Sequence, residues 1–185
     1  MANLDAPNGL KPVRHLTGGV IRTEEFKIES GSSTAIFTGD CVKLLSTGYI
    51  DECDAGDRIL GVFAGCSYAN SSGEQVFSRQ WTASATTQGS VDVTAYVYSD
   101  PQIVFAVQSA GSADFADIGQ LADIVATAGD TNTGQSKHEI SGTTGTGTAG
   151  LRILGLYEEP KNAYGTNGVL EVQIYEHELS FATGV

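Results

Sequence analysis

The sequence predicts an all-β fold, and three observations support this prediction. Glycine is abundant, at 23 of 185 residues, whereas proline occurs only 4 times. Charged residues make up only 17% of the chain, so Ser, Thr, Gly and Asn must form much of the surface. Apolar and polar residues alternate over many short runs that end at turn-forming residues. This combination is typical of short strands joined by tight turns and not of a helical bundle.

At this length the chain fits one domain, or one barrel preceded by an arm. Residues 1–19 contain two prolines and several glycines but few apolar residues, which predicts an extended arm and no core element. We therefore expect an N-terminal arm at 1–19, a single β-barrel-like domain at 20–179 and a loose C-terminal tail at 180–185.

The domain divides into a series of expected strands. They are expected at residues 20–28, 34–37, 41–45, 49–50, 58–63, 76–81, 90–98, 103–107, 151–157 and 168–176. Ser99-Asp100-Pro101 is a turn signal, which predicts that 103–107 pairs back on 90–98 as a hairpin.

One segment, 112–126, is a candidate helix, so we expect at most one short helix. Ser112 or Asp114 could cap it, but Gly119 weakens it. A short helix or turn followed by a strand at 122–126 is therefore expected. Residues 128–150 are rich in Gly, Thr and Ser and predict a flexible loop.

Two stretches half a chain apart share one pattern. The letters RILG stand at 58–61 and again at 152–155, each time followed by an aliphatic and then an aromatic residue. We interpret residues 58–81 and 152–175 as two long-looped hairpins. An old duplication would explain the likeness, and so would the general similarity of hairpins in an all-β protein. Neither copy carries an evident reactive side chain.

The net charge of −12 argues against nucleic acid as the main partner, because a phosphate backbone requires clustered Lys and Arg. The charge is unevenly placed. Before residue 24 there are three cations, Lys11, Arg14 and Arg22, and one anion, Asp5. A slightly basic arm therefore precedes an acidic body, although three charges could also fall there by chance. No apolar run is long enough for a membrane span, and the start has no secretory apolar region, so we expect synthesis in the cytoplasm and no membrane partner.

The three cysteines, Cys41, Cys53 and Cys66, match no zinc or redox spacing. We expect them to be reduced and mostly buried in a chain that matures in a reducing cytosol.

Two motifs suggest ligands but lack the necessary context. Residues 145–150 match GxGxxG formally, yet a polar loop precedes them and a β pattern follows, whereas a dinucleotide site needs a strand before and a helix after. The acidic stretch at 51–57 could hold Ca²⁺, but Cys53 and Ala55 stand where oxygen ligands are needed. We interpret the first as a flexible loop and the second as an exposed charged turn.

The histidines give no metal or catalytic pattern. His177-Glu178 begins like HExxH, but Phe181 stands where the second His is required. His15, His138 and His177 are too scattered in sequence to indicate a metal cluster, and no nucleophile motif occurs. We expect no catalytic residue, no metal site and no cofactor, so an enzyme such as a small hydrolase is disfavoured.

Four stretches resemble one group of small proteins encoded among the head genes of tailed bacteriophages, which are similar to capsid decoration (cement) proteins. The stretches are MANLDAPNGLKPVRHLTGG at 1–19, FTGDCVKL at 37–44, RILGVF at 58–63 and RILGLYEEPKNAYGTNGVLEVQIYEHEL at 152–179. The resemblance implies a β-barrel or β-tulip with an N-terminal arm, on the outer capsid of the virion. It implies binding to the major capsid protein, self-association as a trimer more than as a dimer, and stabilisation of the expanded head. The family offers no catalytic residues.

We expect the arm to contact the shell, through Leu10, Lys11, Val13, Arg14 and His15. A different class is a β-rich surface module that binds carbohydrate or a host surface. For that alternative, Trp81, Tyr68 and Tyr164 would form the aromatic platform.

Overall fold

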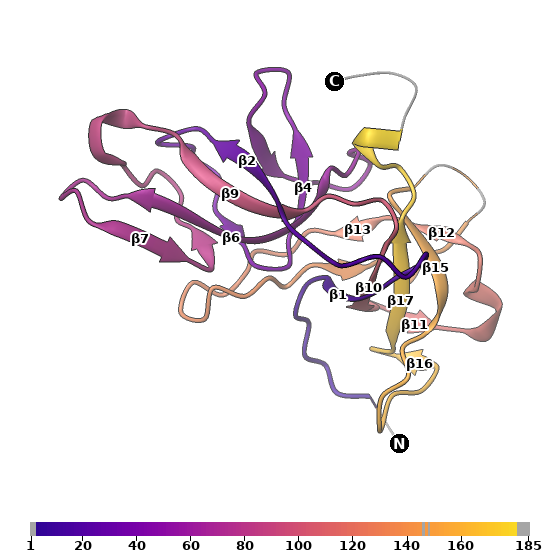
Figure 1. Cartoon of the computed structure of the whole chain (residues 1–185). Helices are drawn as coiled ribbons and strands as arrows, with labels where there is room; N and C mark the ends of the chain where they lie inside the picture. Colours follow the sequence, from indigo (N-terminus) through magenta and orange to yellow (C-terminus); the bar gives the residue numbers. More distant parts are fainter. Residues whose placement is uncertain (1–2, 146, 148, 181–185) are drawn as a thin grey trace.

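The computed structural model describes residues 3–145, 147 and 149–180, and its chain is built almost entirely of strands (Figure 1). The all-β prediction is confirmed. No α-helix forms in the described part of the chain, where three single-turn 3₁₀ segments occur instead. These are η1 (Gln88–Ser90), η2 (Phe115–Asp117) and η3 (Glu178–Ser180).

Two large antiparallel sheets organise the molecule (Figure 1). The five-stranded sheet has the order β1 (Lys11–His15), β10 (Ile103–Gln108), β17 (Val169–Ile174), β15 (Leu151–Leu156) and β12 (Leu121–Ala122). The six-stranded sheet has the order β2 (Glu24–Ile28), β9 (Val93–Tyr98), β6 (Gly61–Ala69), β4 (Cys41–Leu44) and β5 (Ile50–Glu52), with β7 (Gln75–Ser78) also on β6. Both sheets are open, and no closed barrel is found among the described residues.

Three two-stranded ribbons complete the fold. They pair β3 (Ile36–Phe37) with β8 (Gln80–Trp81), β11 (Ser112–Ala113) with β16 (Gly165–Thr166), and β13 (Ile124–Val125) with β14 (Glu139–Ile140). Residues 112–126 thus form short strands around η2, as the turn-then-strand expectation stated. The Asp114 N–H donates to the Asp117 carboxylate at 2.7 Å, which closes that turn.

The buried apolar residues form two core clusters, and several strands alternate between buried and less buried positions. On β9, Val93, Ala95 and Val97 are fully buried while the residues between them are not. One core cluster includes Phe105, Leu151 and Val172 of the five-stranded sheet; the other includes Phe63 and Trp81 beside the six-stranded sheet. The three cysteines are free and buried, as expected.

The expected hairpin of residues 90–98 with 103–107 is wrong. β9 pairs with β2 and β6, whereas β10 pairs with β1 and β17. The turn at Asp100 does form, since the Ile103 N–H donates to the Asp100 carbonyl at 3.1 Å. It carries the chain from one sheet to the other, and a local turn signal does not distinguish a crossing from a hairpin.

The two RILG stretches do form hairpins, β6 with β7 and β15 with β17, each in a different sheet. The first strand of each hairpin also carries a register shift. It lies between Phe63 and Gly65 where β6 pairs with β9, and between Ile153 and Gly155 where β15 pairs with β17. The copies differ at their start, since β15 includes its RILG while β6 begins only at Gly61.

Within the expected flexible loop at 128–150, the structure places strand β14 and three fully buried side chains, Ser136, His138 and Ile140. Low apolar content concealed this segment's role, because two of these three buried side chains are polar. In the GxGxxG stretch, positions 146 and 148 lie outside the described residues, as do 181–185 of the expected tail and residues 1–2 of the expected arm.

The expectation that residues 1–19 contribute no core element is wrong. Leu10 is only 2% exposed and packs in the same cluster as Phe105, and residues 11–15 are strand β1. The N-terminal stretch is therefore part of the folded body from Leu10 onward.

We predict that Leu10→Ala lowers the free energy of unfolding by about 2 to 5 kcal/mol, because it leaves a cavity in the core. Leu4→Ala is the matched control: Leu4 is 80% exposed, so about 0.5 kcal/mol or less is expected. Urea unfolding followed by fluorescence measures both. Equal effects of the two substitutions would show that Leu10 is not a core residue.

Candidate functional site

The N-terminal segment, defined here as residues 3–10, is tied to the body by side-chain amides. Asn3 Nδ2 donates to the carbonyls of Ala163 and Thr166, both at 2.9 Å, and its Oδ1 accepts from the Ala163 N–H at 3.1 Å. This one amide therefore holds the start of the segment to β16 and to the loop before it.

Gln108 of β10 holds the middle of the segment. Its Nε2 donates to the Leu4 carbonyl at 2.8 Å and to the Asn167 carbonyl at 3.3 Å. Its Oε1 accepts from the Ala6 N–H at 3.1 Å. Because this amide is almost fully buried, its hydrogen bonds with the segment also satisfy its own polar atoms.

The end of the segment sits on the β3–β4 turn and on residues 135–136. Leu10 donates its N–H to the Gly39 carbonyl at 2.9 Å, and Gln135 Nε2 donates to the Asn8 carbonyl at 3.0 Å. Gly9 has φ +65°, and a Cβ there would lie 2.5 Å from the Ser136 Cβ and 2.6 Å from the Gly39 oxygen. Only glycine permits this close approach.

Strand β1 continues from the segment and forms one edge of its sheet (Figure 1). It pairs with β10 on one side, with a register shift between Pro12 and Arg14. Its outer edge pairs with no described strand. Arg14 Nη2 reaches Glu171 Oε2 of β17 at 2.7 Å, but both side chains are partly exposed, so this ion pair adds little stability.

The five expected contact residues thus divide into two groups. Lys11 and Arg14 are exposed on β1, and Val13 is partly exposed. Leu10 is only 2% exposed and packs in the core, so its expected contact with a partner stays a prediction. His15 is mostly buried and also serves the fold. Its Nε2 lies 3.1 Å from Asp100 Oδ2, and its Nδ1 accepts from the N–H groups of Thr17 and Gly19.

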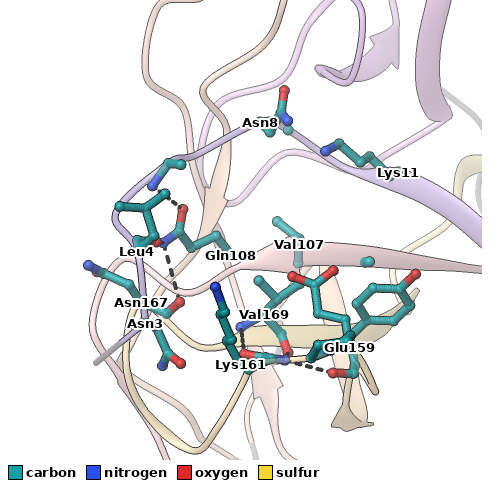
Figure 2. A pocket seen from close by; sticks show the side chains of 16 residues that line it. Asn3, Leu4, Asn8, Lys11, Val107, Gln108, Glu159, Lys161, Asn167 and Val169 are labelled. Atoms are coloured by element: carbon teal, nitrogen blue, oxygen red, sulfur yellow. Dashed lines mark hydrogen bonds between the residues drawn. The ribbon is translucent and has the colours of Figure 1, made fainter. Parts of the chain in front are cut away.

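Two hollows flank the N-terminal segment, and Ala6 and Asn8 line both of them. Figure 2 shows the first, a pocket of about 340 Å³ between the segment, β10 and the loop that leads from β15 to β17. The second, of about 380 Å³, lies between the segment and residues 130–137. The segment is therefore a ridge with a depression on each side.

Three lysines without a hydrogen-bond or ion-pair partner among the described residues lie at these hollows. Lys11 and Lys161 line the first and Lys137 lines the second, and all three are exposed. Asp130 and Glu159 also line the hollows, and Asp5 belongs to the segment itself, so three cations stand beside three anions. The whole chain has 10 cations and 22 anions, so the surface around the segment is less acidic than the chain as a whole.

Most of the other cations are engaged within the fold. Their partners are Glu24 for Arg22, Asp57 for Lys43, the Thr94 hydroxyl for Lys27, the Gln135 amide for Arg79 and the Tyr175 ring for Arg152. The lysines at the hollows are accordingly the ammonium groups most available to an external anion.

The loop that carries Lys161 is held in one shape by Asn162. Its Nδ2 donates to the carbonyls of Tyr157 at 2.7 Å and Val169 at 2.8 Å, and its Oδ1 accepts from the Val169 N–H at 3.0 Å. Lys161 itself has φ +77°, a left-handed conformation that is unfavourable for a side chain of this kind. The hydrogen bonds of Asn162 hold the turn in this shape and offset the conformational free energy that Lys161 loses there.

Below the end of the segment lies a buried cluster that sequence reasoning missed. His138 Nε2 lies 2.9 Å from Glu52 Oε1 and 3.4 Å from Asp40 Oδ1, and the three ligand-type atoms all lie within 4.8 Å of one another. Burial raises the pKa of Asp40 to about 6, while the nearby His138 opposes this shift. Glu52 belongs to the acidic stretch predicted to be an exposed turn, and its side chain is in fact mostly buried against His138.

This cluster has the atoms of a three-ligand metal site but the wrong imidazole tautomer for one. The Cys41 N–H donates to His138 Nδ1 at 3.3 Å, which places the ring proton on Nε2. A metal on Nε2 would require the proton on Nδ1, facing another N–H donor. In this tautomer Nε2 carries a proton and does not offer a lone pair to a metal ion.

The alternative aromatic platform does not form. Trp81 is 0% exposed, and Tyr68 packs edge-on against it with ring centroids 5.5 Å apart. Tyr164 lies in a different part of the chain and packs against Phe115. No specific observation on the described residues favours carbohydrate binding.

Comparisons with known proteins give no relative: no protein-family model, no curated protein and no solved structure matches this chain. Among the described residues, no helix has the length and apolar character needed to cross a membrane.

We predict that Gln108→Ala loosens the N-terminal segment, because it removes the hydrogen bonds to Leu4, Ala6 and Asn167 at once. The loss of stability should be about 1 to 2 kcal/mol. Hydrogen-exchange mass spectrometry should show faster exchange in a peptide covering residues 3–8. Gln173→Ala is the matched control, since that amide donates to the Pro101 carbonyl at 2.8 Å, away from the segment. Unchanged exchange at 3–8 in Gln108→Ala would contradict the anchoring role.

Proposed function

We propose that this protein is a capsid decoration protein of a tailed bacteriophage. It would bind the major capsid protein on the outer surface of the expanded head, as a homotrimer made in the host cytoplasm, and clamp neighbouring capsomers. Two things support the proposal: the sequence resemblance to such proteins, and the exposed edge strand β1 beside three unpartnered lysines. The second observation carries the assignment of the contact surface.

An open strand edge suits attachment to a shell. Its free backbone groups can pair with an extended segment of a partner, and main-chain hydrogen bonds of this kind give affinity without demanding one side-chain sequence. Pro12 lacks an N–H, which limits the edge to a short stretch of pairing and disfavours uncontrolled association.

The charge distribution favours binding to the capsid through one face of the protein. The acidic body repels other acidic surfaces, whereas Lys11, Lys137 and Lys161 offer exposed ammonium groups around the N-terminal segment. Such complementarity mainly sets orientation and association rate, and it weakens with salt. The contact face in this proposal is therefore the N-terminal segment, β1 and the three lysines.

Stabilisation of the head then follows from linkage. A protein that binds the expanded lattice, and not the unexpanded one, stabilises it by RT ln(1 + [L]/Kd) at each site. Individual contacts can be weak because they repeat around the shell. No catalytic group is required for this activity.

The test is co-sedimentation with expanded empty heads of the phage that encodes the chain. We predict that the wild-type protein pellets with the heads at a fixed ratio to the major capsid protein. The double variant Lys11→Glu/Arg14→Glu should bind at least about tenfold more weakly, because two cations of the contact face are reversed.

The control is Arg22→Glu/Lys27→Glu, which changes the net charge equally on exposed residues outside the contact face. Equal weakening by both double variants would show that only net charge matters and would reject the assigned face. A wild-type protein that ignores expanded heads would reject the function itself.

A further inference from the structure

Three chain segments meet at the turn formed by residues 37–40. The Phe37 N–H donates to Asp40 Oδ2 at 2.6 Å, and the Asp40 N–H donates back to the Phe37 carbonyl at 2.9 Å. Gly39 accepts from the Leu10 N–H, and Thr38 accepts from the Ser136 N–H at 3.0 Å. The residues adjacent to Asp40 therefore support both the N-terminal segment and the segment that carries His138.

The hydrogen bonds within the cluster leave one atom without a donor. With its proton on Nε2, His138 donates to Glu52 Oε1, the nearer oxygen. Asp40 Oδ1 is buried, lies 3.4 Å from the same nitrogen and has no hydrogen-bond partner of its own. Burial raises the pKa of this carboxyl, and that effect outweighs a hydrogen bond from the Ser136 side chain, which lowers the pKa. A fully buried carboxylate oxygen without a donor is unfavourable, and one additional proton would remove the charge that makes it so.

That proton has one suitable position, on Asp40. A second proton on the imidazole would sit on Nδ1 and point at the Cys41 N–H. Glu52 already accepts the His138 proton and is closer to solvent. Cys41 and Cys53 are buried, and burial raises the pKa of both thiols, so neither supplies a charge near neutral pH.

Other charged groups lie near the cluster on two sides. Lys43, Asp54 and Asp57 lie near Cys53, and Lys43 donates to Asp57 at 2.6 Å. Lys137 and Glu139 flank His138 in the chain; Lys137 is exposed, and partial burial raises the pKa of Glu139. Asp40 is thus the buried ionisable group whose charge acts most directly on the turn against which residues 8–10 pack.

We propose that Asp40, Glu52 and His138 form a proton-operated clasp: a proton taken up by Asp40 tightens the seating of the N-terminal segment and of residues 135–138, and its loss loosens both. This clasp is a property of the isolated protein and holds whether or not the proposed capsid function is correct. Its effect falls on the contact face, because the segment it holds leads directly into β1.

The direction of the pH effect follows from the shift. The pKa of Asp40 is raised by burial from 3.8 to about 6, so its stabilising contribution is fully present below 3.8 and is lost as pH rises through about 6. His177 acts oppositely: burial lowers its pKa from 6.5 to about 4, so its contribution is lost as pH falls through about 4. The pH dependence of the global free energy of unfolding therefore combines the opposite contributions of Asp40 and His177. A local measurement at the cluster is needed to separate them.

The experiment is amide hydrogen exchange of the full chain by NMR, corrected for the intrinsic pH dependence of exchange. The reporters are the Leu10 and Ser136 amides, and amides of β9 in the other sheet are the internal control. If opening exposes Asp40, linkage predicts about tenfold higher protection of both reporters at about pH 5 than at about pH 7.5.

Asp40→Asn should give the high protection at both pH values, since the amide is uncharged at both and keeps an acceptor for the Phe37 N–H. The matched control is Asp54→Asn, an exposed carboxyl in the neighbouring acidic turn, which should behave as wild type. If Asp40→Asn does not fold, the wild-type profile and Glu52→Gln decide instead. Glu52 raises the pKa of Asp40, so removing its charge should move the midpoint of the profile below that of wild type.

The clasp is overturned if the reporters show equal protection at both pH values, or if the β9 amides change as much as they do. It is also overturned if Asp54→Asn abolishes the pH dependence and Asp40→Asn does not.

Discussion

The β3–β4 turn is the contact on which the interaction surface depends. Its backbone bonds to β6 on one side, where Gly39 donates to the Phe63 carbonyl at 2.8 Å and Phe63 donates to the Asp40 carbonyl at 2.9 Å. On its other side it accepts the N-terminal segment and the Ser136 region. Through this turn the six-stranded sheet supports residues that lead into the edge of the five-stranded sheet. Without it, β1 would have no fixed start.

This arrangement explains how a polar N-terminal stretch can be ordered without a core of its own. Apolar burial is supplied almost entirely by Leu10. The amides of Gln108 and Gln135 bind the backbone of the segment, and the Asn3 amide binds the backbone at Ala163 and Thr166. Buried polar networks of this kind specify one geometry when all their members are satisfied. The result is a ridge with a fixed course, and the three lysines lie beside it, on β1 and on two loops.

Much of the fold was predictable because it depends on local patterns. Alternation located the inward face of β9 and the two RILG hairpins, since a half-buried strand imposes a period of two on its own residues. The partner of a strand is set by the rest of the chain, so the crossing from β9 to β10 could not be distinguished from a hairpin. A single buried leucine in a polar stretch gave no periodic signal, and the N-terminal strand was therefore missed.

The candidate site was harder to predict. Lys11 and Arg14 were identified by charge alone, but Lys137 and Lys161 join them only through the folding of distant loops. The buried cluster brings together residues far apart in sequence, Asp40, Glu52 and His138, and no spacing rule connects them. Trp81 illustrates the converse error: one tryptophan beside a polar loop suggested a ligand platform, whereas its ring is buried in the core cluster beside the six-stranded sheet.

The most direct test of the proposed role is a cryo-electron microscopy reconstruction of expanded heads with and without the added protein. We predict extra density on the outer surface in which the edge of β1 and the ridge at residues 3–10 face the major capsid protein, with the acidic β2 edge turned to solvent. Density with β1 directed away from the shell would contradict the assigned contact face, and the absence of any added density would contradict the capsid function.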